Sequence, residues 1–288
     1  MRPEAACDYL YVNHALQPAP AAEIFARIGE SAIYEVVKVV SGVPLFFDAH
    51  MARLRRSADL SGAIFDVPDF RILDEIGELS IRNGRDRINV KLIWSGPGGG
   101  DLFLTYFIRS EYPGTEAYAR GVHAVLFEGE RADPNIKTLR GSFRDRVREV
   151  REREGAYEAL LVDRNGFVTE GSRSNLFFVR DGRIFTPPAG AVLMGVTRAK
   201  VLEICREMGI PAAERPLHRD ELPRLEGMFI TGTTVDVLPV ASVGDIELDS
   251  VGRSLVREIL GRFGAAARAD IAARAPSGPA AIDRTTEG

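Results

Sequence analysis

Apolar positions in the first hundred residues change their spacing several times, and each spacing predicts a different element. Alternating or β-branched stretches of strand length predict strands at 8–13, 32–40, 43–47, 87–94 and 102–108. Apolar positions three and four apart predict helices at 49–60 and 68–83, after a short helix or loop at 21–31. Asp48 is the expected N-cap of the first long helix. These elements predict an α+β unit with an antiparallel sheet.

The strand at 32–40 ends in Ser41-Gly42, which predicts a hairpin turn. Because side chains alternate along a strand, Tyr34, Val36 and Lys38 share one face. Ile33, Glu35, Val37 and Val39 share the other face. Periodicity alone leaves open which face is buried.

A second mixed pattern begins at position 121. It predicts strands at 121–127, 158–163, 175–180, 183–186, 227–231 and 235–240. Helical spacing predicts helices at 141–154 and 197–209, the first of them heavily charged. Asn165-Gly166 and Asp181-Gly182 are typical of hairpin turns, and Thr169-Glu170-Gly171, taken alone, is typical of an ordinary turn.

The stretch Glu111-Tyr112-Pro113-Gly114-Thr115 has the composition of a linker and separates the two patterns. We therefore expect a small N-terminal α/β domain at 1–113 and a larger domain at 118–265. Residues 266–288 are rich in Ala, Arg, Pro, Gly and Ser, and we expect them to form a disordered tail.

Composition narrows the class of protein. Of the 288 residues 45% are hydrophobic, and the net charge is -4, so the sequence offers no overall attraction to nucleic acid or to an anionic membrane. No apolar run approaches the ~18 residues of a membrane span, and no apolar leader follows Met1. Cys7 and Cys205 form neither a disulfide framework nor a CxxC motif. A cytoplasmic protein is the expectation.

Several common catalytic patterns are absent from the sequence. The histidines show no HxxH or HExxH spacing, so we expect no metal site. Gly171-Ser172-Arg173-Ser174 resembles a GxSxG nucleophile motif only in composition. The glycine-rich stretch 95–100 lacks the Lys-Ser/Thr of a phosphate loop, so it is better explained as a flexible hairpin or a lid.

Lys137 is the candidate reactive group. It follows a Pro-Asn turn and has Ile136 and Leu139 as neighbours. Partial desolvation favours the neutral amine, which attacks carbonyl groups. The alternative is an ordinary surface lysine at the end of a strand.

Three separate stretches suit an anion. Gly195-Val196-Thr197-Arg198 precedes a predicted helix, and backbone N–H groups at a helix start bind anions. Thr231-Gly232-Thr233-Thr234 is a hydroxyl-rich turn between strands, and Arg53 can make a bidentate contact. The alternatives are a simple N-cap at Thr197 and a solvated face for Arg53. Together with a reactive lysine, these stretches indicate a phosphorylated aldehyde cofactor.

The ordered motifs resemble the fold-type IV pyridoxal-phosphate enzymes. These are the class IV aminotransferases, which include branched-chain and D-amino acid aminotransferases, and the 4-amino-4-deoxychorismate lyases. The motifs are IK-T-L, EALLVD-x-NG-x-VTEGS-x-SN-L-F, DG-x-I-x-TPP, GVTR and F-I-TGTT-x-x-x-x-PV. The resemblance runs from about Ile33 to Val240. It implies two α/β domains, the larger with a β-barrel-like core, a pyridoxal 5'-phosphate cofactor in the cleft between them, and a homodimer.

The resemblance also implies residue roles. Lys137 would form the Schiff base with the cofactor and carry the proton, and Glu170 would pair with the pyridinium nitrogen. The remaining cofactor-binding positions would be Arg53, Val196, Thr197, Thr233 and Asn175. Gly232 and Thr234 would lie near the substrate.

The chain departs from the family on the substrate side. The Arg and His that trap a carboxylate in D-amino acid enzymes are replaced by Gly-Pro-Gly-Gly-Gly after Trp94, and Arg173 stands where a small residue is usual. Tyr34, Lys38 and Lys91 are therefore the candidate substrate-carboxylate residues. The alternative for the two lysines is structural pairing with nearby acids.

The function implied is amino-group transfer between an amino acid and a 2-oxo acid through a quinonoid intermediate. One alternative is an aminodeoxychorismate lyase, which would release pyruvate without an amino acceptor. A cofactor-binding protein without catalysis is the alternative from another class, and the presence of both Lys137 and Glu170 argues against it.

Overall fold

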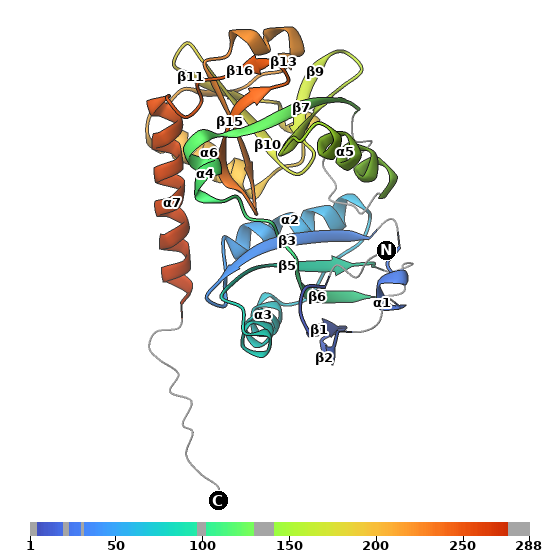
Figure 1. The fold of residues 1–288 in the computed structure, drawn as a ribbon. Coiled ribbons are helices and arrows are strands. Elements are labelled where there is room, and N and C mark those ends of the chain that lie inside the picture. Colours follow the sequence, from blue (N-terminus) through green and yellow to red (C-terminus); the bar gives the residue numbers. More distant parts are fainter. Residues whose placement is uncertain (1–4, 20–22, 30–31, 97–101, 130–140, 276–288) are drawn as a thin grey trace, which may run out of the picture.

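The computed structural model describes residues 5–19, 23–29, 32–96, 102–129 and 141–275. The N-terminal half is built around a six-stranded sheet of order β2-β1-β6-β5-β3-β4, in which every pairing is antiparallel (Figure 1). Its elements are β1 (Tyr9–Val12), β2 (Ala15–Pro18), α1 (Glu23–Ala26), β3 (Ile33–Val40), β4 (Val43–Pro44), α2 (Phe47–Leu60), α3 (Asp69–Asn83), β5 (Arg87–Trp94) and β6 (Phe103–Ile108). The predicted antiparallel α+β unit is confirmed.

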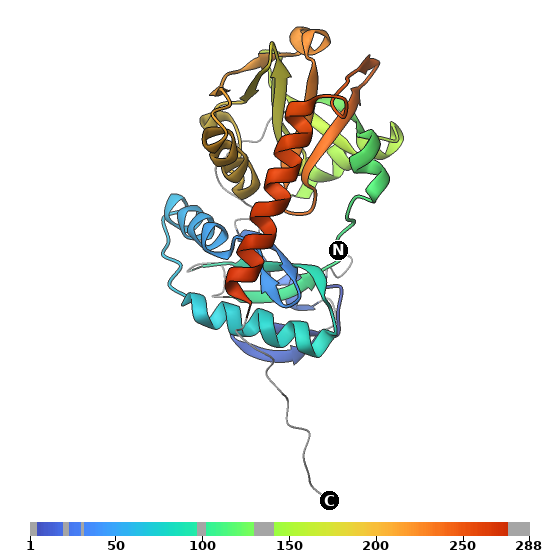
Figure 2. The same ribbon diagram turned by 90° about the vertical axis from the view of Figure 1, so that its left-hand side faces the viewer.

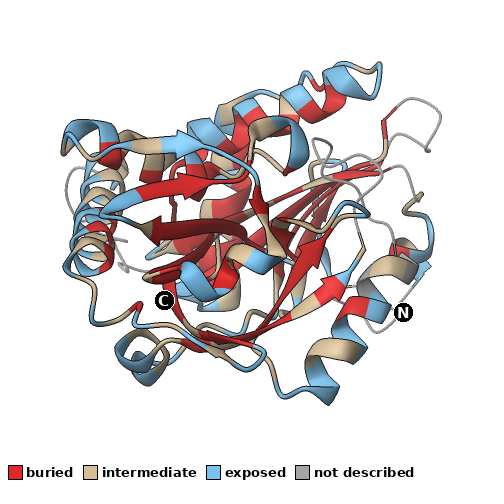
Figure 3. Ribbon diagram, turned by 90° about the horizontal axis from the view of Figure 1, so that it is seen from above, coloured by how far each residue is buried: buried red, intermediate tan, exposed pale blue. Residues whose placement is uncertain are grey.

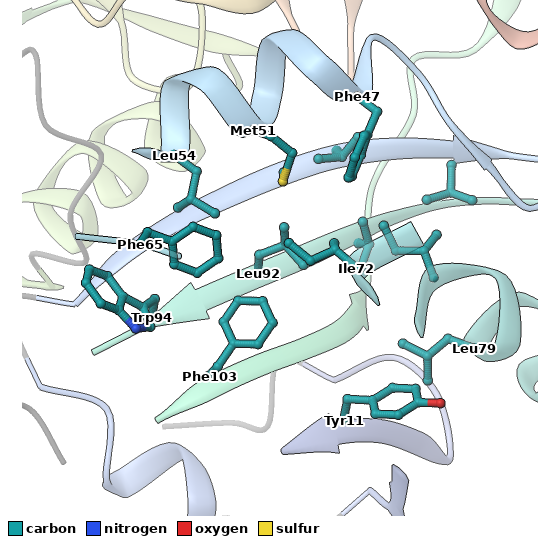
Figure 4. Close-up of a cluster of buried hydrophobic side chains, with 14 of the residues drawn as sticks. Tyr11, Phe47, Met51, Leu54, Phe65, Ile72, Leu79, Leu92, Trp94 and Phe103 are labelled. Carbon is teal, nitrogen blue, oxygen red and sulfur yellow. The ribbon is translucent and has the colours of Figure 1, made fainter. Parts of the chain in front are cut away.

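Helices α2 and α3 bury their apolar stripes against one face of this sheet. Met51 and Leu54 of α2 and Ile72 of α3 are almost fully buried against Val37 and Leu92 (Figure 4). Burying each such side chain contributes about 1.5–3 kcal/mol. The opposite face of the sheet carries Tyr34, Lys38 and Lys91, and Lys38 reaches Asp236 of the C-terminal half.

The C-terminal half contains a ten-stranded mixed sheet of order β12-β11-β10-β14-β15-β7-β8-β9-β13, with β16 paired to β15. Its strands are β7 (Val122–Glu128), β8 (Glu158–Val162), β9 (Phe167–Gly171), β10 (Asn175–Arg180), β11 (Arg183–Thr186), β12 (Ala212–Glu214), β13 (Leu217–His218), β14 (Gly227–Gly232), β15 (Asp236–Val243) and β16 (Ile246–Glu247). The helices are α4 (Thr115–Arg120), α5 (Gly141–Arg153), η1 (Ala189–Ala191), α6 (Val196–Glu207), η2 (Arg219–Arg224) and α7 (Ser254–Arg274). The strands are largely buried, and the helices expose their outer faces (Figure 3). No helix of the described residues is long and apolar enough to cross a membrane.

Helix α7 extends beyond the C-terminal sheet and passes along the N-terminal half (Figure 2). Val256, Ile259 and Phe263 anchor it in a core that also contains Leu45 and Phe46 from the N-terminal half. The expectation of a disordered tail from 266 is wrong for residues 266–274, which continue this helix. Alanine is the best helix former, and the packed face of α7 supplies the burial that composition alone does not reveal.

Two other sequence-based expectations are wrong. Helix α2 begins at Phe47, not after Asp48, and its N-cap position is Phe46, which adopts a left-handed conformation with φ 50°. Phe46 and Phe47 enter different cores, and this packing overrides the capping preference of Asp48. Thr169-Glu170-Gly171 lies on strand β9 and is not a turn.

Helix α4 begins at Thr115, at the end of the predicted linker, and the division into domains at 113 and 118 stays a prediction.

The packing of α6 predicts a difference between the two cysteines. Burial raises the pKa of the Cys205 thiol to about 11, so only about one molecule in a thousand carries the thiolate at pH 8. Cys7 is only partly buried. Iodoacetamide at pH 8 followed by peptide mass spectrometry should modify Cys7 and spare Cys205 in the native protein. Modification of both thiols at equal rates would contradict this packing, and both should react in denaturant.

Candidate functional site

Three of the predicted cofactor residues meet at one short segment, Leu193–Met194, which directly precedes α6. Glu170 on β9 accepts a hydrogen bond from the Leu193 amide (3.1 Å). Asn175, the first residue of β10, donates its side-chain amide to the Leu193 carbonyl (2.8 Å). Arg53 of α2 donates to the Met194 carbonyl (3.3 Å). Residues far apart in the sequence therefore hold the start of α6 in place.

Glu170 is buried, with 3% of its surface exposed. The loop between β9 and β10 is itself fixed by the buried carboxylate of Glu158. This carboxylate accepts hydrogen bonds from the hydroxyls of Ser172 (2.5 Å) and Ser174 (2.8 Å). A side chain at Gly171 would collide with Ser174 and Glu158, so the turn requires glycine there. These contacts restrain the loop, and Glu170 and Asn175 flank it.

Arg53 forms a buried bidentate ion pair with Glu35 of β3. Its Nε donates to one carboxylate oxygen (2.8 Å) and its Nη2 to the other (2.5 Å). Burial alone would lower the pKa of Arg53, but the Glu35 carboxylate raises it above its ordinary value, so the guanidinium stays charged. These bonds and the one to Met194 leave one N–H on each Nη without a partner among the described residues.

The start of α6 is built for close approach. Val196 and Thr197 form its first turn, and Gly195 at the N-cap position supplies no side-chain cap. A Cβ on Gly195 would lie 2.0 Å from the Asn175 Oδ1 atom, so only glycine fits beside Asn175. The backbone N–H groups of a helix start carry partial positive charge, which favours an anion.

Thr231 was not recognised from the sequence as a separate site residue. It pairs with Asn175 across β10 and β14, and it is 1% exposed. Its Oγ1 atom is buried without a hydrogen-bond partner among the residues that the structure describes. A buried hydroxyl normally has a partner, so this group suits a ligand that supplies one. The threonine-rich run was the available signal.

Glu35 was also missed. It is fully buried between apolar neighbours, on the strand face that carries Ile33, Val37 and Val39. A single carboxylate on an otherwise apolar strand face needs a cationic partner, and that was the signal in the sequence.

The turn from β14 to β15 touches the polar face of the N-terminal sheet. Thr233 donates its hydroxyl to the Val36 carbonyl (3.3 Å). Thr234 accepts a hydrogen bond from the Asn89 side-chain amide (2.8 Å), and Asn89 accepts one from Tyr112 (2.8 Å). The sequence alone does not indicate Asn89 and Tyr112 as members of this network. The predicted cofactor residue Thr233 and the predicted substrate residue Thr234 are therefore neighbours in space of β3 and β5.

The two candidate substrate lysines differ in their surroundings. Lys38 is 3% exposed, and its Nζ donates to Asp236 Oδ1 (2.6 Å). Desolvation lowers the pKa of Lys38, and the Asp236 carboxylate opposes this shift. Lys91 is also buried, and its Nζ lies 5.1 Å from the centre of the Tyr34 ring. Structural pairing therefore describes Lys38, while Lys91 and Tyr34 form a second group on the same face.

The remaining predicted positions have plain descriptions. Gly232 ends β14, and a Cβ there would lie 3.3 Å from the Arg173 carbonyl oxygen. Arg173 donates to the Tyr157 carbonyl at 3.2 Å. Lys137 and residues 97–100 of the glycine-rich stretch lie outside the described residues. A cavity of about 260 Å³ lies between α2, α6 and α7, and Val196 is the predicted site residue that lines it.

Comparison with known proteins gives a consistent family. The statistical model of the family "Amino-transferase class IV" matches residues 32–243. The D-alanine aminotransferase of Bacillus licheniformis is 30% identical over 223 residues, which are 73% of this chain and 78% of that protein. The branched-chain-amino-acid aminotransferase of Escherichia coli K12 is 34% identical over 221 residues, 69% of this chain and 70% of that protein.

The fold likewise matches solved structures. The PLP-form of the branched-chain amino acid aminotransferase from Thermobaculum terrenum superposes with a TM-score of 0.77 at 21% identity, covering 93% of this chain and 95% of that chain. At this identity the match shows the fold, which confirms the predicted fold-type IV architecture.

The Lys38–Asp236 pair predicts a cost when its charge balance is broken. Asp236→Asn keeps the side-chain shape and tolerates the left-handed backbone at this position (φ 55°). It leaves the buried Lys38 ammonium without a counter-charge. Because Asp236 is partly exposed, we expect a loss of about 1–3 kcal/mol in the free energy of unfolding, measured by urea denaturation. Lys38→Met combined with Asp236→Asn should recover part of this loss. Equal stability of wild type and Asp236→Asn would show that the pair carries no net weight.

Proposed function

The chain belongs to the amino-transferase class IV family, and from this we propose that it is a pyridoxal 5'-phosphate-dependent aminotransferase. It would move an amino group from an amino acid to a 2-oxo acid. The observation that carries the proposal is the meeting of Glu170, Asn175 and Arg53 at Leu193–Met194, directly before the α6 N-terminus. A buried carboxylate and a helix N-terminus that favours an anion thus lie beside the same segment. A phosphorylated pyridine compound requires both, one for its ring nitrogen and one for its phosphate.

The described residues fit this cofactor. The N–H groups at the start of α6 and the remaining N–H groups of Arg53 would hold its phosphate, with the hydroxyls of Thr197 and Thr233 beside them. The unpartnered Thr231 hydroxyl is a further donor. Asn175 would support the edge of the ring. Neutralising Arg53 with Glu35 does not prevent this role, because two of its N–H directions stay open.

The residues of the chain would divide the chemistry between them. When bound, pyridoxal 5'-phosphate supplies an electron sink for the carbon that carries the amino group. Glu170 would hold a proton at the ring nitrogen, and burial keeps this contact free of competing water. Lys137 would attach the cofactor through Nζ and then move a proton at the substrate carbon.

The lysine inventory supports Lys137 for this role. The chain has lysines at 38, 91, 137 and 200. Lys38 is paired with Asp236, and Lys200 pairs with Glu203 on α6 (2.6 Å). Lys91 lies beside Tyr34 on the N-terminal sheet. On the substrate side Tyr34, Lys38 and Lys91 stay the candidates for the carboxylate, and Lys38 is already paired with Asp236.

The role of Lys137 can be tested by its cofactor. The purified wild-type protein should be yellow, with a visible band that shifts when an amino donor is added. Borohydride reduction and peptide mass spectrometry should place the phosphopyridoxyl group on Lys137. Lys137→Ala should lose the band, whereas Lys200→Arg should keep it. An unchanged spectrum in Lys137→Ala, or label on another lysine, would overturn the assignment.

The role of Glu170 can be tested by its charge. Glu170→Gln keeps the shape but no longer holds a proton at the ring nitrogen, so we expect kcat to fall by about 100-fold or more with the cofactor still bound. Glu247→Gln on the exposed β16 is the control. Activity is measured with both enantiomers of alanine, glutamate and leucine and a 2-oxo acid acceptor. Unchanged kcat in Glu170→Gln would contradict the proposed role.

The same assay separates the aminotransferase from the lyase. Product formation by an aminotransferase should need the 2-oxo acid acceptor, whereas pyruvate release from aminodeoxychorismate without an acceptor would indicate the lyase.

A further inference from the structure

Helix α7 reaches from the C-terminal half to the first residues of α2. Asp270 Oδ2 accepts a hydrogen bond from the Phe46 amide (2.7 Å), across 224 positions of sequence. Arg274, one turn later on α7, donates to Asp48 of α2 (2.5 Å) and lies 3.6 Å from Asp270. The same face of α7 presents Phe263, whose ring meets that of Phe46 edge-on with centroids 5.8 Å apart.

The contact with Asp270 meets a local need of α2. The helix begins at a residue in the left-handed conformation, which costs about 1–2 kcal/mol for a side chain other than glycine. No side chain of α2 caps its N-terminus. The Asp270 carboxylate supplies an acceptor for the N-cap amide and a negative charge at the positive end of the helix, both of which stabilise this start.

Phe46 and Val196 share one apolar core, but beside this core the packing of α2 against α6 is incomplete. A cavity of about 260 Å³ opens between α2, α6 and α7, and Phe46, Asp48, Val196, Asp270 and Arg274 are among its lining residues. Where side chains leave a gap, neighbouring elements are held by the few bonds that cross it. Here α7 supplies two bonds to α2, from Asp270 and Arg274, and shares a core with Val201 and Ile204 of α6.

The position of α2 relative to α6 matters for the proposed function. Helix α2 carries Arg53, which reaches the Met194 carbonyl, and α6 carries Val196 and Thr197 at its start. A shift of α2 would therefore move one side of the phosphate seat relative to the other. We propose that Asp270 and Arg274 form a latch that sets the spacing of α2 and α6, and that Asp270 is a positioning residue for the phosphate of the cofactor. This inference rests on the proposed function.

The test separates phosphate binding from general stability. The full-length chain, freed of cofactor, is titrated with pyridoxal 5'-phosphate and, separately, with pyridoxal, which lacks the phosphate. The variants are Asp270→Ala, Asp270→Asn and Arg274→Ala. Glu258→Ala is the matched control, because it lies on α7 and its ion pair is with Arg262 of the same helix.

We expect Asp270→Ala to weaken pyridoxal 5'-phosphate binding roughly fivefold to tenfold and to leave pyridoxal binding within about twofold. Asp270→Asn retains an acceptor for the Phe46 amide, so its affinity should lie nearer to that of wild type. Arg274→Ala should also lose less affinity than Asp270→Ala. Glu258→Ala should match wild type.

The latch is overturned if Asp270→Ala binds pyridoxal 5'-phosphate as tightly as Glu258→Ala, or if it loses affinity equally for both ligands. If Asp270→Ala does not fold, unchanged affinity in both Asp270→Asn and Arg274→Ala overturns the latch. A wild-type chain that binds neither ligand would instead overturn the proposed function.

Discussion

The buried ion pair of Arg53 and Glu35 is the interaction on which the arrangement of the site depends. Both groups are almost fully buried, so each needs the other: removing one partner of such a pair leaves a charge in a low-dielectric interior at a cost of about 3–5 kcal/mol. The pair fixes α2 on β3. Because the same guanidinium reaches the Met194 carbonyl, it also connects this rigid unit to the segment that begins α6.

Other contacts between the two halves use apolar burial, a hydrogen bond and an ion pair, and they hold the halves in the same arrangement. Leu45 and Phe46 leave the N-terminal half and enter the core formed by α6, α7 and β14, so apolar burial joins the halves near the start of α2. On the other side, Thr233 and Asp236 bind β3 through a hydrogen bond and an ion pair. Contacts from β3 and from the start and the middle of α2 limit rotation of one half relative to the other. A ligand between them then meets groups that are already in place, which reduces the ordering cost of binding.

The sequence predicted those parts of the fold that local pattern determines. Strands β5, β10 and β11 have the predicted bounds, because each is an apolar run enclosed by turn residues. Strand β9 was missed because its last residues, Glu170 and Gly171, are unusual in a strand, and their burial comes from Leu193 and Glu158. Helix α7 is not among the predicted elements, because its Ala- and Gly-rich composition hides the apolar face that packs at Val256, Ile259 and Phe263.

The site shows the same division. Motifs identified Glu170, Asn175 and Arg53, and these three meet at one segment. The motifs do not identify the residue that pairs with each buried charge. Glu35 and Asp236 follow from the rule that a buried cation needs an anion, but only the fold shows that Glu35 belongs to Arg53 and Asp236 to Lys38.

This balance of charges has a consequence for ligand binding. Arg53 and Lys38 are each neutralised within the chain, so neither acts on a ligand as a full, uncompensated positive charge. An anion at the site that we propose near α6 would then be bound by N–H groups at the helix start and by the hydrogen-bond directions that Arg53 has left, which are sensitive to position over less than an ångström. Such a site would select an anion by its geometry more than by its charge. It therefore requires that α2, β9 and α6 be held accurately, and the long-range bonds from Glu35, Asn175 and Asp270 supply that constraint.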